Sequence, residues 1–216
     1  VNLIKAMQTE EDLLSEKFEK FMHEEKCESP YDVTKLPSYN DRRAMEIIES
    51  STKKIGNKYE VRQPWKTIEP SMPDNKAVVF RRFLSLMRKL SKDQETFENY
   101  KKAIEKYFES DYAERVPENE IDTEPGKVNY LAHHGVQHER KESRIVFDTS
   151  LRTNGKSLSN SIYTGPDVLQ SLFGVLLRFR LRPVAVTCDF KAFYHSVLIP
   201  ECDRNFYRFF WIDGQS

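Results

Sequence analysis

The chain has 216 residues, which is enough for one large domain or for one and a half small ones. Its 34 Lys and Arg balance its 34 Asp and Glu, and its 14 Phe and 10 Tyr supply core material, which argues against a disordered chain. With only 7 Gly and 10 Pro, the composition excludes a collagen-like or linker-like chain. No apolar run approaches the ~18–20 residues of a membrane span.

The cysteines and the first residues bear on location. Cys27, Cys188 and Cys202 form an odd and sparse set, which is typical of a reducing, intracellular setting and not of a disulfide framework. Residues 1–10 show no signal-peptide pattern. We therefore expect an intracellular, cytoplasmic protein.

Helical patterns dominate residues 1–110. A capping box at 9–12 and apolar side chains at helical spacing indicate where helices begin and which face they bury. Gly56 is expected to end the second helix, and Asp93 is the expected N-cap of the last. The expected helices cover 9–29, 40–55, 80–90 and 94–108.

Beyond Asp111 the pattern changes to that of strands. One further helix is expected, because Pro166 suits a first helical turn and apolar residues follow through Leu177. The last residues follow an expected strand over 206–212 that lacks a return strand, so we expect the chain to be a piece of a longer polypeptide. The other expected strands cover 58–62, 113–116, 128–132, 144–148, 184–189 and 196–199.

A basic stretch lies between residues 76 and 92 and contains no acidic residue. Such a stretch is a candidate surface for a polyanion such as nucleic acid. A solvated helix face would look the same, and the sequence alone favours that plainer interpretation. The basic residues are Lys76, Arg81, Arg82, Arg88, Lys89 and Lys92.

A single acidic residue ends the apolar run over 183–188. Such a run is typical of a central strand buried on both faces, and a carboxylate at its end needs compensation for its lost hydration. Asp189 could cap the turn over 190–194, which is the commoner role, or it could hold a divalent cation.

The expected strand over 144–148 places Arg144, Val146 and Asp148 on one face. Arg144 could grip a phosphate through two hydrogen bonds, or it could pair with an acid across the sheet. Three nearby histidines do not make a metal motif, because Gly135 interrupts them and no fourth ligand has zinc-like spacing. The sequence has no Walker loop, no G-x-G-x-x-G and no G-x-S-x-G.

A more specific pattern comes from several short segments that keep their order and spacing over some eighty residues. These segments are 130–136 (YLAHHGV), 144–150 (RIVFDTS), 154–160 (NGKSLSN), 165–169 (GPDVL), 176–180 (LLRFR), 189–195 (DFKAFYH), 203–204 (DR) and 208–211 (RFFW). Together they closely resemble the reverse transcriptase region in the Pol polyprotein of BEL/Pao-type long-terminal-repeat retrotransposons. Residues 41–117 resemble the lead-in helices of that family more weakly, and 1–39 match only loosely.

The resemblance implies an α+β fold, namely the fingers and part of the palm of a right-hand polymerase. Such a fold has an antiparallel sheet with helices and is preceded here by a helical N-terminal region. The implied domains are an N-terminal helix and linker over 1–39, a helical lead-in over 40–117, and fingers with a partial palm over 118–216. The last of these stops before the second and third catalytic aspartates.

The resemblance also implies roles for single residues. Asp189 matches the catalytic, metal-binding aspartate of the first palm motif, and the main-chain carbonyl of Phe190 would help to hold Mg²⁺ or Mn²⁺. Arg144 matches the fingers arginine that contacts the incoming triphosphate, with Lys141 as the accompanying lysine. Tyr194 matches the steric gate, an aromatic ring under the sugar that favours deoxynucleotides.

The implied reaction is RNA-directed DNA synthesis by two-metal nucleotidyl transfer, with dNTP and an RNA or DNA template-primer as substrates. The basic side chains at Arg81, Arg82, Arg88 and Lys89 would contact the nucleic-acid backbone. The family's other two carboxylates come from a later aromatic-x-Asp-Asp hairpin, which this sequence does not contain. We therefore expect no polymerase activity from the chain without the remainder of the Pol polyprotein.

Two further hypotheses belong to other classes. One is a non-catalytic remnant of a retroelement that binds nucleic acid. RNA binding that depends on salt and on the basic residues of 76–92, but not on Asp189, would favour it. The other is a chain that does not fold stably by itself, for which a broad, non-cooperative melt would speak.

Overall fold

The computed structural model describes residues 37–121, 123–138, 141–181 and 183–212. The chain divides into two compact units. The larger unit comprises Tyr39–Gly165 and Lys191–Ser216, and the described part of the smaller unit is mainly Pro166–Phe190. The helix expected over 9–29 lies outside the described residues.

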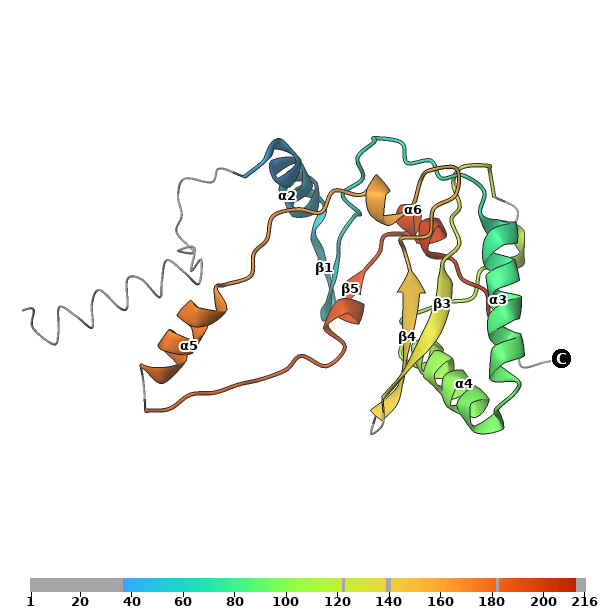
Figure 1. Cartoon of the computed structure of the whole chain (residues 1–216). Coiled ribbons are helices and arrows are strands. Elements are labelled where there is room, and N and C mark those ends of the chain that lie inside the picture. Colours follow the sequence, from blue (N-terminus) through green and yellow to red (C-terminus); the bar gives the residue numbers. More distant parts are fainter. Residues whose placement is uncertain (1–36, 122, 139–140, 182, 213–216) are drawn as a thin grey trace, which may run out of the picture. The chain divides into compact units, whose positions relative to one another are not determined.

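Within its described residues, the larger unit contains four α-helices and two small sheets (Figure 1). The helices are α2 (Tyr39–Ser51), α3 (Lys76–Leu90), α4 (Gln94–Glu109) and α6 (Glu201–Arg204). The strands are β1 (Lys53–Ile55), β2 (Lys58–Glu60), β3 (Ala132–His138), β4 (Lys141–Asp148) and β5 (Val197–Leu198). Short 3₁₀ helices are η1 (Glu118–Glu120), η2 (Ser159–Ser161), η3 (Phe193–Ser196) and η4 (Asn205–Tyr207).

Three expected helices are confirmed as α2, α3 and α4. The expected cap of α4 is present, because the Asp93 carboxylate accepts the backbone N–H of Glu95 at 3.1 Å and the hydroxyl of Thr96 at 2.5 Å. The hydrogen bond from the Thr96 side chain is the main reason that the pKa of Asp93 is lowered. A capping carboxylate satisfies free N–H groups and complements the helix dipole, so α4 begins where its sequence predicts.

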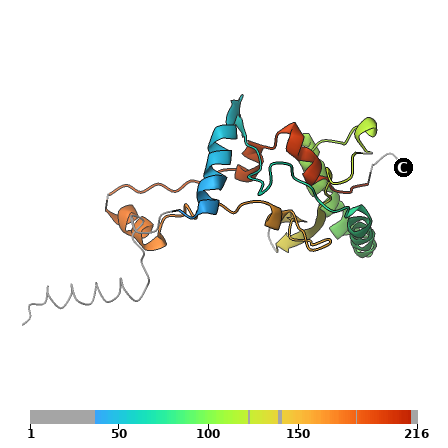
Figure 2. The ribbon, with the colours of Figure 1, turned by 90° about the horizontal axis from the view of Figure 1, so that it is seen from above.

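The end of α2 differs from the prediction. Gly56 does not end the helix; it lies in the turn of the β1–β2 hairpin with a φ of 58°. The helix ends earlier, where Thr52 bonds back to the carbonyl of Ile48 through both its N–H and its hydroxyl. A hydroxyl residue that satisfies a terminal carbonyl in this way competes with further helix. Figure 2 shows α2 leading into this hairpin.

The first sheet joins distant parts of the chain. Strand β2, expected over 58–62, pairs in antiparallel fashion with β1 and in parallel fashion with β5, so the strand order is β1-β2-β5. Strand β5 confirms the expectation over 196–199 in a shorter form. Residues 191–212 are thereby fixed against the beginning of the larger unit.

The second sheet is the antiparallel hairpin β3–β4, and it confirms the strand expected over 144–148. One face carries the buried side chains of His133 and Ile145. That face packs on α4, where the Tyr100 ring lies 3.0 Å from the position that a Cβ on Gly135 would take. A glycine is needed at this point because ring and backbone approach so closely.

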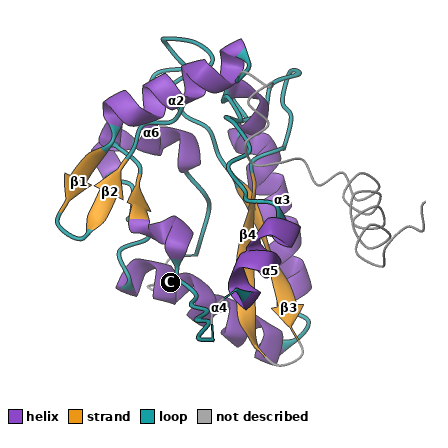
Figure 3. Ribbon diagram, turned by 90° about the vertical axis from the view of Figure 1, so that its left-hand side faces the viewer, coloured by secondary structure: helices purple, strands orange, loops and turns teal. Residues whose placement is uncertain are grey.

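The helices α3 and α4 pack against the β3–β4 hairpin. They contact β3 and β4 respectively, and Figure 3 shows both beside this hairpin and not beside β1 and β2. The aromatic residues after η4 complete the packing: Trp211 stacks on Tyr100 at 5.6 Å and Phe210 stacks on Tyr130 at 4.8 Å.

The hydrophobic core of the larger unit has two clusters. The first consists of Trp65, Met72, Leu131, Leu158 and Phe206, and the second of Leu90, Tyr100, Ile104 and Ile145.

Three expected strands of the larger unit are wrong. Residues 113–116 form none. Of 128–132 only Ala132 lies in a strand, as the first residue of β3, and the sole ladder contact between 128–132 and 206–212 is an isolated parallel bridge between Tyr130 and Arg208. The guanidinium of Arg208 is buried instead and donates to the carbonyl oxygens of Glu120 and Ile121. The N–H of Tyr130 donates to the side chain of Asn75, and the N–H of Asn129 donates to the carbonyl of Asn205 at the start of η4, so the ladder does not extend beyond the bridge.

The smaller unit departs furthest from expectation. Its helix α5 (Leu172–Arg180) begins after Ser171, so Pro166 is not in its first turn. The run over 184–189 is not a strand: Val184 is 76% exposed and Val186 is 81% exposed. A central strand becomes buried only when neighbouring strands pair with both its edges, and no segment among the described residues pairs with this one.

The coarse fold class is confirmed, because helices and mixed and antiparallel strands occur together in an α+β arrangement. Among the described residues, none of the helices is both long and apolar enough to cross a bilayer.

Candidate nucleotide and nucleic-acid site

Arg144 lies on the outer face of the β3–β4 hairpin. It is exposed and faces Val136 on the neighbouring strand, whereas the adjacent Ile145 points into the core. Within the described part of the chain, the Arg144 guanidinium forms no ion pair, so the expected alternative of an acid across the sheet is not observed. The inner face of the hairpin is fixed to α4, and Arg144 is therefore a free cation on a rigid support.

An ion pair connects α3 to the same hairpin. Arg82 Nη1 lies 3.1 Å from Asp148 Oδ2, and Asp148 Oδ1 accepts the hydroxyl and the N–H of Ser150 at 2.7 and 3.0 Å. The Ser150 hydroxyl is the largest cause of the lowered pKa of Asp148, and the Arg82 charge acts in the same direction. Arg82, an expected nucleic-acid contact, is thus already engaged within the fold.

The other expected nucleic-acid contacts lie on the open face of α3. Arg81 and Arg88 are about two helical turns apart on the side opposite the buried Val79 and Leu90. Every basic residue of 76–92 is exposed, and Arg82 alone forms an ion pair among the described residues. The stretch is therefore a positive surface that contains no acidic residue of its own. Such a surface agrees both with a nucleic-acid contact and with a solvated helix face.

Asp189 lies near the end of the extended segment of the smaller unit. Its carboxylate is exposed and forms no hydrogen bond or ion pair within the described residues. The turn that follows starts η3 after Ala192 and has no side-chain cap, so the capping role considered for Asp189 is not observed.

The donor set for a metal is incomplete in the part of the chain that the structure describes. No group of three or more His, Cys, Asp or Glu lies close enough there to hold a metal ion. Asp189 offers one carboxylate and Phe190 one carbonyl, which is fewer oxygens than Mg²⁺ takes from a complete site. We therefore derive no chemical step through a metal.

Tyr194 lies in a tight turn of the larger unit, and its side chain is exposed. Ala192 adopts a left-handed conformation with a φ of 52°, and its carbonyl accepts the N–H of His195 at 2.9 Å. The Tyr194 ring is 86% exposed and has Phe193 as its ring neighbour at 5.7 Å. An aromatic ring presented in this way is free to contact a sugar or a base.

His195 anchors this turn, and the sequence did not single it out. Its ring stacks on Tyr112 at 4.3 Å and meets the edge of Tyr107 at 5.1 Å, beside the end of α4. Burial lowers the pKa of His195. The stacking fixes the residue next to Tyr194, and no local signal in the sequence relates His195 to tyrosines some eighty residues earlier.

The positions of the remaining expected site residues are known only in part. The backbone of Lys141 opens β4 opposite His138, and the Lys141 side chain lies outside the described part. Asp189 and Phe190 belong to the smaller unit, whereas Arg144 and Tyr194 belong to the larger one. The geometry of the expected site is therefore described separately for the residues of each unit.

The chain was compared with protein-family models, with curated proteins and with solved structures, and none of them matched.

Proposed function

We propose that this chain contributes fingers and part of the palm to an RNA-directed DNA polymerase of the BEL/Pao retrotransposon type. The observation that carries the proposal is Arg144, an exposed arginine without an ion-pair partner among the described residues, on a hairpin whose other face is packed on α4. A guanidinium held in this way is suited to a triphosphate, because it can form charge-assisted hydrogen bonds without first breaking an ion pair.

The remaining roles follow from the motifs and the exposed groups. Tyr194 would lie under the deoxyribose and reject a 2′-hydroxyl, and Asp189 with the carbonyl of Phe190 would hold Mg²⁺ or Mn²⁺. The metal ions would supply activation of the attacking oxygen and stabilisation of the leaving group. Lys141 would assist Arg144 at the phosphates. The exposed cations of α3 would follow the template-primer backbone, and the whole would act in the cytoplasm.

Binding of dNTP tests the proposal directly. Titration of the chain with a fluorescent dNTP in Mg²⁺ should give a Kd that rises about tenfold or more in Arg144→Ala, since a charge-assisted hydrogen bond contributes roughly 1.5–3 kcal/mol. Arg152→Ala is the matched control, because Arg152 is also an exposed arginine of the larger unit. Equal Kd values for wild type and Arg144→Ala would overturn the nucleotide role of Arg144.

Primer extension tests the catalytic part. The proposal expects no product from the chain by itself with Mg²⁺ or Mn²⁺, because two-metal transfer needs carboxylates besides Asp189. Product that disappears in Asp189→Asn would contradict this expectation and show a complete site.

A second candidate function is nucleic-acid binding without catalysis, and the exposed basic face of α3 favours it. It predicts RNA binding that is unchanged in both Arg144→Ala and Asp189→Asn and is lost when Arg81 and Arg88 are neutralised. A dNTP affinity that depends on Arg144 would decide for the polymerase.

A further inference from the structure

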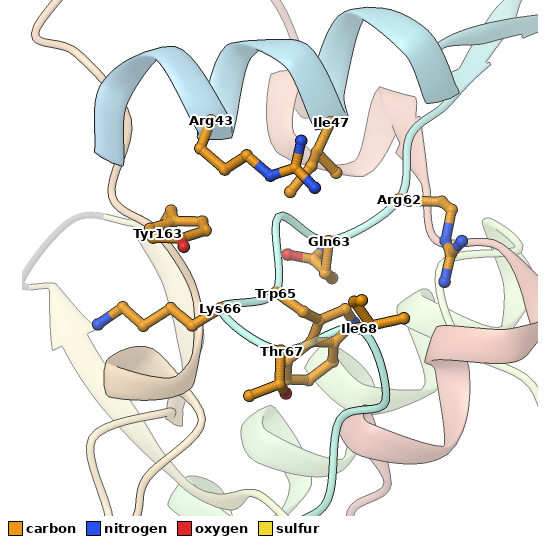
Figure 4. A pocket seen from close by; sticks show the side chains of 9 residues that line it. All are labelled: Arg43, Ile47, Arg62, Gln63, Trp65, Lys66, Thr67, Ile68 and Tyr163. Atoms are coloured by element: carbon orange, nitrogen blue, oxygen red, sulfur yellow. The ribbon is translucent and has the colours of Figure 1, made fainter. Parts of the chain in front are cut away.

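A pocket of about 210 Å³ lies beneath α2 in the larger unit, and none of the residues proposed for polymerisation lines it (Figure 4). Its walls come from α2, from the loop that follows β2 and from Tyr163. The chain beyond Tyr163 passes against α2, where Gly165 lies next to the fully buried Ala44. The pocket is therefore built from three segments of one compact unit.

The pocket is basic. Arg43, Arg62 and Lys66 line it, and no carboxylate does. Figure 4 shows Arg43 projecting from α2 over the pocket, with Arg62 and Lys66 at opposite sides. Arg43 also pairs with Glu46 at 3.0 Å, but both side chains are largely exposed, and such surface pairs contribute little and yield to a better anion.

The pocket also offers an aromatic ring and uncommitted hydrogen-bonding groups. In the described part of the chain, the Tyr163 ring has no aromatic or cationic partner, and its hydroxyl forms no hydrogen bond. The same holds for the side-chain amide of Gln63 and for the guanidinium of Arg62. The edge of Trp65 and the side chain of Ile47 add apolar surface.

The backbone that carries these groups is fixed before any ligand arrives. Tyr163 N–H donates to the carbonyl of Pro64 at 2.8 Å, and Lys66 N–H donates to the carbonyl of Ser161 at 3.0 Å. The buried carboxylate of Asp203 accepts the N–H of Gln63 at 3.0 Å behind the pocket wall. A site held in this way loses little conformational entropy on binding.

We propose that this pocket binds one nucleoside phosphate unit, with the base against the Tyr163 ring and the phosphate between Arg43 and Lys66. Cations with a free aromatic ring are the combination that recognises single nucleotides, since the base stacks while the phosphate is neutralised. The volume is below the roughly 300–1,000 Å³ of pockets that enclose a drug-sized ligand, so part of the nucleotide would stay in solvent, and a dinucleotide cofactor would have still less room. The proposal uses none of the residues proposed for polymerisation. Because the pocket would also take the base and a phosphate of a dNTP, the dNTP titrations with and without Arg144→Ala are compared in the Tyr163→Leu background.

The nucleoside phosphate in the pocket could be a free nucleotide or one residue of a single-stranded nucleic acid. Two titrations distinguish these ligands. AMP is titrated calorimetrically into the chain, and a fluorescent single-stranded RNA 10-mer is followed by anisotropy. Tyr163→Leu removes the ring and should weaken AMP binding about tenfold, the typical value of one stacked base, whereas Tyr163→Phe keeps the ring and should bind nearly as wild type.

The test of charge uses two exposed lysines. Lys66 Nζ donates to the carbonyl of Asn160 at 2.9 Å, which leaves its other N–H groups for the phosphate. Lys66→Gln should weaken AMP binding by about tenfold, and Lys102→Gln at another exposed lysine, on α4, should leave it unchanged. RNA binding that falls in the same variants identifies the strand as the source, and RNA binding that does not fall identifies the free nucleotide. Absence of AMP binding at millimolar concentration, or equal AMP affinity in wild type, Tyr163→Leu and Lys66→Gln, would overturn the proposal whatever the dNTP titration shows.

Discussion

Asp203 joins the beginning and the end of the larger unit. Its two carboxylate oxygens accept the indole N–H of Trp65 at 2.9 Å and the backbone N–H of Gln63 at 3.0 Å, and the residue is only 1% exposed. The indole N–H is buried and the Gln63 N–H is partly buried, and each would lose its partner if the carboxylate were removed. Asp203 thereby fixes the loop that carries one wall of the nucleoside phosphate pocket.

Replacing Asp203 should therefore be costly. We expect Asp203→Ala to lower the free energy of unfolding by about 3 kcal/mol, since it leaves one buried and one partly buried donor unsatisfied and creates a small cavity. Urea unfolding followed by circular dichroism measures this. Glu201→Ala, an exposed acid of the same helix, is the control and should change stability by less than about 0.5 kcal/mol. Similar losses in both variants would show that the buried hydrogen bonds are not the cause.

His133 is a core residue and not a metal ligand. Its Nε2 lies 2.8 Å from the carbonyl of Phe210, which can only accept, so Nε2 carries the proton and Nδ1 accepts the hydroxyl of Tyr100 at 2.6 Å. Burial lowers the pKa of His133, with a smaller contribution from the charge of His134. The folded chain therefore holds the imidazole neutral.

This predicts a loss of stability in mild acid. Above the unfolded pKa of about 6.5 both states hold neutral His133, whereas below it the unfolded chain takes up a proton that the folded chain resists. Stability should fall from pH 7.5 to 5.5, by at most about 1.4 kcal/mol per pH unit, with His195 adding a smaller loss in the same sense. Urea titrations should show a flatter profile in His133→Gln and only a small change in His134→Gln, because the charge of His134 is a smaller cause of the lowered pKa than burial. An equal slope in all three proteins would refute the assignment.

Among single residues, the sequence predicted well where the surroundings are local. The Asp93 cap depends on residues two and three positions away, and it was predicted correctly. The Trp65 partner of Asp203 is 138 residues distant, and the tyrosines that hold His195 are some eighty residues away, so no local pattern could indicate either. The common face of Arg144, Val146 and Asp148 followed from strand alternation, which is again local.

At the level of elements, the contact between β3 and α4 depends on a glycine. A Cβ at Gly135 would lie 3.0 Å from two carbons of the Tyr100 ring, and that ring is held by its hydrogen bond to His133. We expect Gly135→Ala to destabilise the larger unit by about 1–3 kcal/mol, because the ring cannot yield without breaking that bond. Chemical denaturation measures the loss.

The control for this prediction is a glycine whose neighbour can move. In α5, a Cβ at Gly174 would meet only the flexible end of Arg178 at 3.4 Å, so Gly174→Ala should be neutral or stabilise its helix by up to about 1 kcal/mol. Destabilisation of equal size at both positions would attribute the effect to the backbone and not to Tyr100.

Helices were predicted more reliably than strands, for a physical reason. The stripe that defines α3 or α4 lies within one segment, whereas a strand exists only where a partner is in register. Residues 144–148 have such a partner in β3, and 184–189 have none among the described residues despite their stronger apolar pattern. The sequence therefore indicates which segments can extend and not which of them pair.

At the scale of the whole molecule, the proposed contacts with nucleotide and nucleic acid and the proposed metal binding depend on different units. The outer hairpin face and the basic side of α3 need only the larger unit, whereas metal binding by Asp189 needs the smaller unit as well. Nucleotide contacts through Arg144 and backbone contacts through α3 can therefore be measured independently of catalysis. Salt dependence is the measurement that separates backbone contacts from every other kind.

Binding of single-stranded RNA should depend on salt through α3. Each phosphate contact contributes a slope of about −0.7 to log K against log salt concentration, so Arg81→Glu with Arg88→Glu should reduce the slope by about 1.4. The control pair Lys102→Glu with Lys127→Glu makes the same change in net charge at exposed positions outside α3 and should leave the slope nearly unchanged. Anisotropy titrations over a series of salt concentrations provide both slopes. If the two pairs reduce the slope equally, the chain attracts RNA by its overall charge, and α3 is only the solvated helix face that its sequence equally allows.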